Sequence, residues 1–175
     1  MVFDFSRDAV CSFTGHRDLP PEKRDALRSL LRRTLRTLAL DRGMSVFLTG
    51  GAMGFDRMAA EEVLALRERY GGIRLFLFLP FPGYDAKWPR GERAALADLL
   101  KKADGSLCAA DAYYPGVYFA RDRMLVNLSS VCVSYLEKTR GGTFYTVSYA
   151  KDAGIEVIPL ANRIAGRYND PGTDA

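Results

Sequence analysis

The sequence predicts an α/β fold with a mainly parallel sheet of about six strands and helices on both faces. Short β-rich apolar runs alternate with helical runs of about a dozen residues, an order typical of parallel sheets with right-handed crossovers. Residues 73–79, IRLFLFL, are apolar on both faces, as a central parallel strand requires. Residues 46–56, VFLTGGAMGFD, join a strand to a helix through a glycine-rich turn. The expected fold is therefore Rossmann-like and doubly wound.

The first half of the chain opens with a short lead-in, residues 1–8, and an apolar strand that runs into Thr14-Gly15-His16-Arg17. Leucines then recur every three or four positions, Pro20-Pro21 suits a helix start and Asp41-Arg42-Gly43 suits its stop. The elements predicted for this half, in order, are a strand at 9–13, a helix at 20–40, a strand at 46–48, a helix at 55–70 and a strand at 73–79.

The second half continues the alternation after Pro80 breaks the central strand. A loop over residues 84–90 holds the single tryptophan, and Gly141-Gly142-Thr143 opens the last predicted helix. The elements predicted for this half, in order, are a helix at 91–103, a weak strand at 106–109, a helix at 117–128, a strand at 130–136, a helix from 141 to 153 and a strand at 155–160.

The length of 175 residues fits one domain with a sizeable core, which we place at residues 1–161. Residues 162–175 are polar, contain Pro171-Gly172 and are expected to form a flexible tail. No apolar run could span a bilayer and no basic-then-apolar leader opens the chain, so we expect a cytoplasmic protein with no membrane partner. The net charge of +4 suits an anionic small molecule or a weak nucleic-acid contact.

The three cysteines, Cys11, Cys108 and Cys132, lie in apolar, strand-like segments. They lack the C-x-x-C spacing of metal sites, and their number is odd. Buried, reduced thiols are therefore expected, with no metal site and no resident cofactor.

The glycine turn after the second strand is the strongest candidate for a binding site. Gly50, Gly51 and Gly54 would let the backbone approach a phosphate, which the free N–H groups of the helix start would face. Asp56 lies just beyond the turn, where it could cap the helix or accept a hydrogen bond from a ribose hydroxyl. Because a carboxylate repels phosphate, a ligand at Asp56 would contact it through sugar or base. A tight turn without a ligand is the alternative.

Polar, glycine and aromatic residues also follow other predicted strands, and the carboxyl ends of parallel strands meet at one edge of a sheet. His16 could act as an acid or base, or as a hydrogen-bond donor that orients a loop or a ligand. Arg17 would bind a phosphate or carboxylate, unless it lies on the surface. Candidate ligand contacts at these strand ends are Thr14, Gly15, His16, Arg17, Gly141, Gly142 and Thr143.

An aromatic loop follows the central strand. Pro80, Phe81, Tyr84 and Trp88 could stack on a base, or could form a hydrophobic lid or a dimer contact. Pro80, Phe81 and Trp88 are therefore further candidate ligand contacts. The apolar helices likewise allow a homodimer without requiring one.

The blocks TGHR, TGGAMGFD, PFPGYDAKW, YFARDRMLVNLS and RGGT, in this order, resemble the YpsA-like branch of the SLOG superfamily. These Rossmann-like proteins are related to the lonely-guy phosphoribohydrolases and to the DNA-processing protein of natural transformation. The resemblance covers roughly residues 9–160 and implies a pocket for a nucleotide-derived ligand. By helical spacing Arg123 and Asn127 share one face of a helix, whereas Arg121 points elsewhere. The resemblance implies that Arg123 and Asn127 line this pocket, and a solvated helix face is the alternative.

The sequence departs from the phosphoribohydrolases after Gly141-Gly142-Thr143. Those relatives carry a glutamate shortly after the corresponding turn, whereas residues 144–148 of this chain are FYTVS, without a carboxylate. Glycosidic cleavage needs a carboxylate to support charge or activate water. No catalytic residue is assigned, and whether any reaction is catalysed stays open.

Three functions are therefore considered. The first is binding of a nucleotide or nucleotide-derived ligand, similar to ADP-ribose or NAD, by a cytosolic sensor or regulator. The second is a phosphoribohydrolase-like hydrolase acting on nucleoside monophosphates. Binding of single-stranded DNA is ranked last, because the sequence has no long basic stripe interleaved with aromatic residues.

Overall fold

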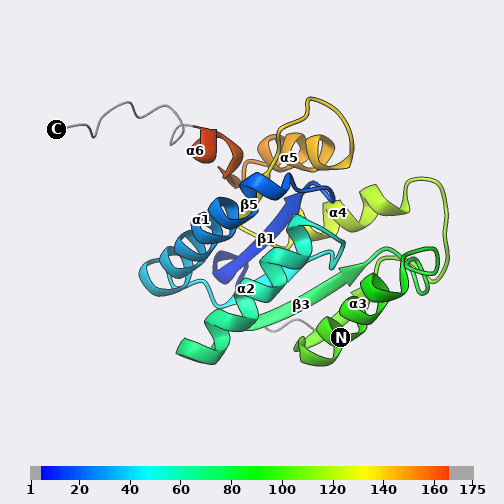
Figure 1. The fold of residues 1–175 in the computed structure, drawn as a ribbon, viewed down its shortest axis with the longest axis horizontal. Coiled ribbons are helices and arrows are strands. Elements are labelled where there is room, and N and C mark those ends of the chain that lie inside the picture. Colours follow the sequence, from blue (N-terminus) through cyan, green and yellow to red (C-terminus); the bar gives the residue numbers. More distant parts are fainter. Residues whose placement is uncertain (1–4, 166–175) are drawn as a thin grey trace.

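The computed structural model describes residues 5–165, and these form one six-stranded sheet that is parallel throughout (Figure 1). The strand order is β4-β3-β2-β1-β5-β6, so the Rossmann-like fold class predicted from the sequence is confirmed. The strands are β1 (Val10–Gly15), β2 (Val46–Thr49), β3 (Arg74–Leu79), β4 (Gly105–Cys108), β5 (Val131–Tyr135) and β6 (Glu156–Pro159).

Helices cover both faces of this sheet. The helices are α1 (Arg24–Arg36), α2 (Phe55–Tyr70), α3 (Arg90–Lys102), α4 (Val117–Asn127), α5 (Gly142–Asp152) and α6 (Ala161–Ala165). The leucines of α1 and the buried residues of α2 and α3 share one apolar cluster, whereas α4 and α5 contribute to two separate clusters. The helices α1 to α3 therefore cover one face, and α4 and α5 cover the other. No helix within residues 5–165 is both long and apolar enough to cross a membrane.

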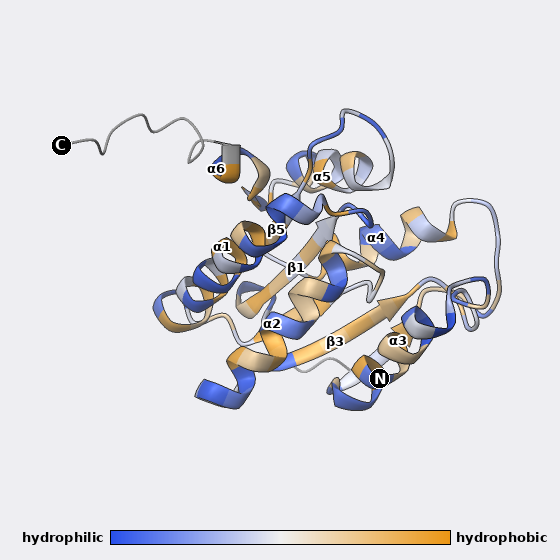
Figure 2. Cartoon of the chain, in the orientation of Figure 1, coloured by the Kyte–Doolittle hydropathy of each residue, from blue (hydrophilic) through white to orange (hydrophobic). Residues whose placement is uncertain are grey.

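The central strand β3 shows why the sheet is buried on both sides. Leu75, Leu77 and Leu79 belong to the cluster that α1, α2 and α3 cover. Phe76 and Phe78 point the other way and join the cluster that includes α4. Figure 2 shows β3 as hydrophobic over nearly its whole length, while α1 carries hydrophilic residues along its outer side. The double-sided apolar pattern thus places β3 inside the sheet.

Some predicted boundaries differ from the structure. The helix predicted over 20–40 is α1 preceded by the short turn Pro21–Lys23 and followed by a wider π-helical turn, Thr37–Asp41. Residues Arg7–Ala9, at the end of the predicted lead-in, form a 3₁₀ turn. The predicted tail begins within α6, and residues 166–175 lie outside the described part of the chain.

The strand order determines where a ligand would bind. The chain adds β2, β3 and β4 on one side of β1 and then crosses over to place β5 on the other side. The loops after β1 and β5 therefore diverge and leave a crevice at their carboxyl ends, the place where doubly wound sheets bind ligands.

Candidate functional site

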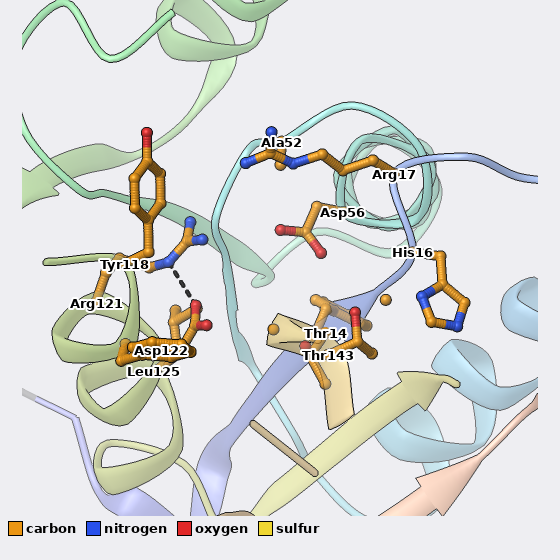
Figure 3. A pocket seen from close by; sticks show the side chains of 14 residues that line it. Thr14, His16, Arg17, Ala52, Asp56, Tyr118, Arg121, Asp122, Leu125 and Thr143 are labelled. Carbon is orange, nitrogen blue, oxygen red and sulfur yellow. Dashed lines mark hydrogen bonds and ion pairs between the residues drawn. The ribbon is translucent and has the colours of Figure 1, made fainter. Parts of the chain in front are cut away.

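A cavity of about 350 Å³ opens at this crevice between β1 and β5 (Figure 3). Its walls come from the end of β1 and the loop after it, the start of α2, the first turns of α4 and the start of α5. The lining residues are Phe13, Thr14, Gly15, His16, Arg17, Ala52, Asp56, Tyr118, Phe119, Arg121, Asp122, Leu125, Gly142 and Thr143.

The glycine turn before α2 packs against the loop after β1. The N–H of Phe55, the first residue of α2, donates to the His16 carbonyl at 3.0 Å. Gly54 has φ +81°, and a Cβ at this position would lie 2.1 Å from the Arg17 carbonyl oxygen. Gly54 is therefore required for the close approach of two backbone segments.

The carboxyl group of Asp56 lies in the cavity wall. Asp56 is only 7% exposed, and its Oδ1 has no hydrogen-bond partner in the described residues. Burial raises the pKa of Asp56 from its ordinary value of 3.8 to about 7. The nearby Arg121 opposes this pKa shift and Asp122 adds to it, while Arg17 opposes it more weakly. At neutral pH the protonated and ionised forms of Asp56 are thus both populated.

Arg121 is held in place by three acceptors. Its Nη1 donates to the carbonyl oxygens of Gly50 at 3.3 Å and Phe78 at 3.2 Å, and its Nε donates to Asp122 Oδ1 at 2.7 Å (Figure 3). Asp122 Oδ2 in turn accepts from the Thr146 hydroxyl at 3.0 Å. Arg121 therefore has a fixed position that ties α4 to the glycine turn.

Gly50 leaves the space that the Arg121 guanidinium occupies. A Cβ at Gly50 would lie 2.0 Å from Arg121 Nη1 and 2.7 Å from Asp56 Oδ2. Among the glycines of this turn, Gly50 and Gly54 thus serve the packing of the site, and none of the three lines the cavity itself.

His16 is oriented by a backbone hydrogen bond. Its Nε2 accepts from the Glu137 N–H at 2.9 Å, and its ring packs edge-on against Tyr135. Burial, and then the positive charge of Lys138, lower the pKa of His16. The ring is therefore neutral at pH 7, and since Nε2 is an acceptor its proton lies on Nδ1, which makes His16 a donor.

The start of α5 brings positive character to the opposite wall. Gly141, the residue before the helix, has φ +98° and no side chain to cap the N–H groups of the first turn. Gly142 and Thr143 of this turn line the cavity.

Arg17 is exposed at the mouth and has no hydrogen bond or ion pair with other residues in the range 5–165. A helix N-terminus and a guanidinium are both well suited to bind an anion.

The structure gathers seven of the residues singled out by sequence at this cavity. They are Thr14, Gly15, His16, Arg17, Asp56, Gly142 and Thr143. Gly141 lies directly before α5, and Gly50, Gly51 and Gly54 lie behind the wall. The role of each of these residues in ligand binding stays a prediction.

The aromatic loop after β3 does not line the cavity, although Phe81 contacts Tyr118, which does. Phe81 packs edge-on against Tyr84, Tyr113 and Tyr118, and Trp88 packs against Tyr84. Pro80, Phe81 and Trp88 do not line the cavity, because two strands separate the end of β3 from the crevice.

The predicted pocket residues on α4 are also placed elsewhere. Arg123 Nη1 donates to the Tyr145 hydroxyl at 2.8 Å, and Asn127 Oδ1 accepts from the Tyr149 hydroxyl at 2.9 Å. Both side chains thus contact the outer part of α5, and neither lines the cavity.

The predicted ligand contacts did not include four residues that line the cavity, Arg121, Asp122, Tyr118 and Phe119. These residues occupy the first turns of α4, a helix that begins at the carboxyl edge of the sheet after Gly116. A usable signal existed, because the first turn of such a helix faces the crevice regardless of helical periodicity.

Metal-ligating side chains do not cluster in residues 5–165. No group of three or more His, Cys, Asp or Glu side chains there could hold a metal ion. Cys11 and Cys132 are buried free thiols, and Cys108 is partly buried.

The chain belongs to the YspA SLOG family, whose model, YpsA, matches residues 18–156. The resemblance predicted from the five sequence blocks is thereby confirmed. A UPF0398 protein of Shouchella clausii is 28% identical over 116 residues, which cover 64% of this chain and 62% of that protein. A UPF0398 protein of Oceanobacillus iheyensis is 30% identical over 109 residues, or 61% of this chain and 59% of the relative. The matched region thus spans less than two thirds of these relatives.

Two solved structures share the fold. DNA processing protein A of Streptococcus pneumoniae superposes with a TM-score of 0.62 at 18% identity, covering 85% of this chain and 49% of that chain. DNA processing protein A of Helicobacter pylori, from a study of its single-stranded DNA binding mode, gives 0.61 at 18% identity, covering 87% and 65%. At this identity the similarity concerns the fold.

Proposed function

We propose that the cavity binds a nucleotide or nucleotide-derived ligand and that the protein acts as a sensor or regulator. The observation that carries this proposal is the position of the cavity. It lies where the strand order reverses, and there it combines the N-terminus of α5, the exposed Arg17 and Asp56, whose Oδ1 has no hydrogen-bond partner in the described residues. Ligand sites in open α/β sheets occupy this place.

The chemistry of the walls suggests how such a ligand would lie. A phosphate would bind to the free N–H groups of α5 and to Arg17. Asp56 would accept from a sugar hydroxyl, because its ionised form repels phosphate and its Oδ1 lacks a partner. Tyr118 and Phe119 offer aromatic surface to the base.

The volume of the cavity bears on the size of the ligand. About 350 Å³ lies at the lower end of the range for small-molecule sites, about 300–1,000 Å³. One nucleotide is therefore the best match for the cavity. A longer ligand, similar to ADP-ribose or NAD, would extend beyond its mouth.

Removing the Arg17 side chain is expected to weaken nucleotide binding. Arg17→Ala should lower the affinity for AMP by about 10- to 100-fold, because a hydrogen bond to a charged group contributes about 1.5–3 kcal/mol. Isothermal titration with AMP, ADP-ribose and NAD measures this loss. Arg36→Ala, which removes an exposed arginine from the far end of α1, serves as the matched control and should bind like wild type.

Native mass spectrometry of the purified protein provides an independent test. A retained nucleotide of definite mass would support the proposal and name the ligand class. If no nucleotide of the panel binds more tightly than about 1 mM, the proposal is wrong.

A hydrolase is the second candidate, because the cavity contains carboxyl groups that the sequence prediction did not find near Gly141-Gly142-Thr143. Asp56 and Asp122 both line the cavity, and they differ in environment. Asp56 has a pKa of about 7, whereas Asp122 accepts from Arg121 and Thr146. Two carboxyl groups in different environments are the groups that glycosidic cleavage uses.

Release of free base from AMP tests this candidate. The wild-type protein should liberate adenine, detected by chromatography, and Asp56→Asn should abolish the release. If prolonged incubation yields no base while AMP still binds, the hydrolase candidate is removed and the binding function stands.

A nucleic-acid ligand also returns as a candidate. The sequence analysis ranked binding of single-stranded DNA last, and the comparisons do not support that ranking. DNA processing protein A of Helicobacter pylori, which shares the fold, was studied for its single-stranded DNA binding mode. A cavity for one nucleotide could also hold one unit of a strand. Cytoplasmic location and homodimer formation remain predictions.

A further inference from the structure

Exposed aromatic side chains gather around the first turns of α4 and α5. Among the described residues, six large apolar side chains are exposed, and four of them lie in or directly before these turns. The four are Tyr113 (63% exposed), Tyr114 (44%), Phe119 (42%) and Phe144 (40%). Exposed apolar surface at this density, next to a polar cavity, indicates a binding surface.

Three rings form a continuous row on the outer side of these helices, which we call the aromatic strip. Phe119 and Tyr145 have ring centroids 4.4 Å apart, and Tyr145 stacks on Tyr149 at 6.4 Å with an interplanar angle of 13°. Arg123 and Asn127 hydrogen-bond to the hydroxyls of Tyr145 and Tyr149. The rings are thus held in fixed positions with a guanidinium beside them, and of the three Phe119 is exposed while Tyr145 and Tyr149 are half-buried.

The aromatic strip is continuous with the cavity. Phe119 lines the cavity and also contacts Tyr145, so one ring belongs to both surfaces. If one nucleotide of a longer ligand fills the cavity, the rest of that ligand would therefore leave the cavity beside Phe119. The next aromatic surface that such a ligand meets is Tyr145.

We propose that the aromatic strip stacks the base that neighbours the nucleotide in the cavity, so that the ligand is a single-stranded nucleic acid. This proposal rests on the proposed nucleotide-binding function of the cavity. Single strands are bound by aromatic rings combined with positive charge. Arg123 contacts the row of rings through Tyr145, and the exposed Arg17 lies in the cavity lining. The formal net charge of +4 of the whole chain complements a polyanion.

The test compares a single nucleotide with a strand of the same base. The probes are dAMP and a fluorescein-labelled oligodeoxyadenylate of about 12 nucleotides, within the usual site size of such proteins. Wild-type protein should bind the strand more tightly than dAMP, and this affinity should fall as salt is raised. Tyr145→Ala should lower the ratio of strand to dAMP affinity by about 5- to 100-fold, the loss of one stacked base.

Two further variants separate stacking from other effects. Tyr145→Phe keeps the ring and loses only the hydroxyl, so it should retain most of the strand affinity. Tyr70→Ala removes an exposed aromatic ring from the far end of α2 and should bind both probes like wild type.

The outcomes distinguish the two proposals. Tight binding of dAMP without tighter binding of the strand would refute the aromatic strip and leave the cavity function intact. An unchanged ratio in Tyr145→Ala, or a shift of that variant from dimer to monomer in size-exclusion chromatography, would also refute it. Binding of neither probe would count against the nucleotide site itself.

Discussion

The variant Gly54→Ala is expected to destabilise the protein by about 2–6 kcal/mol. Gly54 has φ +81° and ψ −125°, a conformation that costs other residues about 1–3 kcal/mol. The added Cβ would also lie 2.1 Å from the Arg17 carbonyl oxygen and 2.5 Å from that of His16. Backbone atoms cannot swing aside as side chains do, so this overpacking adds about 1–3 kcal/mol. Urea denaturation followed by circular dichroism measures the free energy of unfolding.

Gly71 offers a matched control for the conformational part of this effect. It has φ +66° and ψ 179° at the end of α2, and a Cβ there would meet open space. Gly71→Ala should therefore cost only about 1–3 kcal/mol. If Gly54→Ala is no more destabilising than Gly71→Ala, the close packing of the two loops is not what requires glycine at residue 54.

Much of the fold could be predicted, because each strand carries its own signal. The strands β2 and β3 are short apolar runs bounded by glycine or proline, and both were predicted within one or two residues. Strand ends that depend on contacts with distant parts of the chain were predicted less well from the sequence. Strand β1 extends to Gly15, beyond the predicted end at residue 13, because its ladder with β5 continues through the pair Gly15 and Tyr135.

Two features of the helices had no readable signal. In the turn Thr37–Asp41 the leucine spacing continues through Leu38, so periodicity does not mark the change from an α-helix to a wider turn. Helix α6 has only five residues, too few for a periodic pattern.

The site was predicted only in part, because its assembly depends on strand order. The sequence marks polar ends after β1, β2, β3 and β5 but does not say which of these ends are neighbours. The order β4-β3-β2-β1-β5-β6 places the end of β1 beside that of β5 and removes β3 from the crevice. His16, Arg17 and Thr143 therefore line the cavity, whereas Phe81 and Trp88 do not.

The inner side of α4 could not be identified from its residue pattern. Arg121, Asp122 and Arg123 are consecutive, so charges surround the helix and no apolar stripe marks its buried side. Spacing correctly placed Arg123 and Asn127 on one face, and the structure shows this face turned toward α5. Arg121 is the buried one, because the carbonyl groups of Gly50 and Phe78 accept its hydrogen bonds.

The variant Asp56→Asn is expected to be more stable than wild type at pH 8, by up to about 4 kcal/mol. Burial raises the pKa of Asp56 from 3.8 to about 7, and each pKa unit corresponds to about 1.4 kcal/mol between the two protonation states. The ionised carboxylate is thus destabilising in the folded protein, whereas asparagine is neutral and has a similar shape. Urea denaturation at a series of pH values measures the difference.

The sign of the pH dependence follows from proton binding. Between pH 4 and pH 7 the folded protein holds a proton on Asp56 that the unfolded chain has lost. The favourable contribution of Asp56 is therefore complete below about pH 4 and is lost as the pH rises to about 7. The stability difference between Asp56→Asn and wild type should accordingly be small at pH 4, grow through this window and level off above it.

Asp98 provides the control for this prediction, because it is exposed on α3, where it forms an ion pair with Lys102. Asp98→Asn should change stability by no more than about 0.5 kcal/mol. The stabilised Asp56→Asn variant should also bind AMP more weakly, since it loses the charged acceptor of the cavity. Such a gain in stability with a loss of binding is expected where a buried carboxyl group with a free acceptor oxygen is kept for its ligand. An Asp56→Asn protein with the pH profile of wild type would show that Asp56 is ionised in the folded state at pH 5.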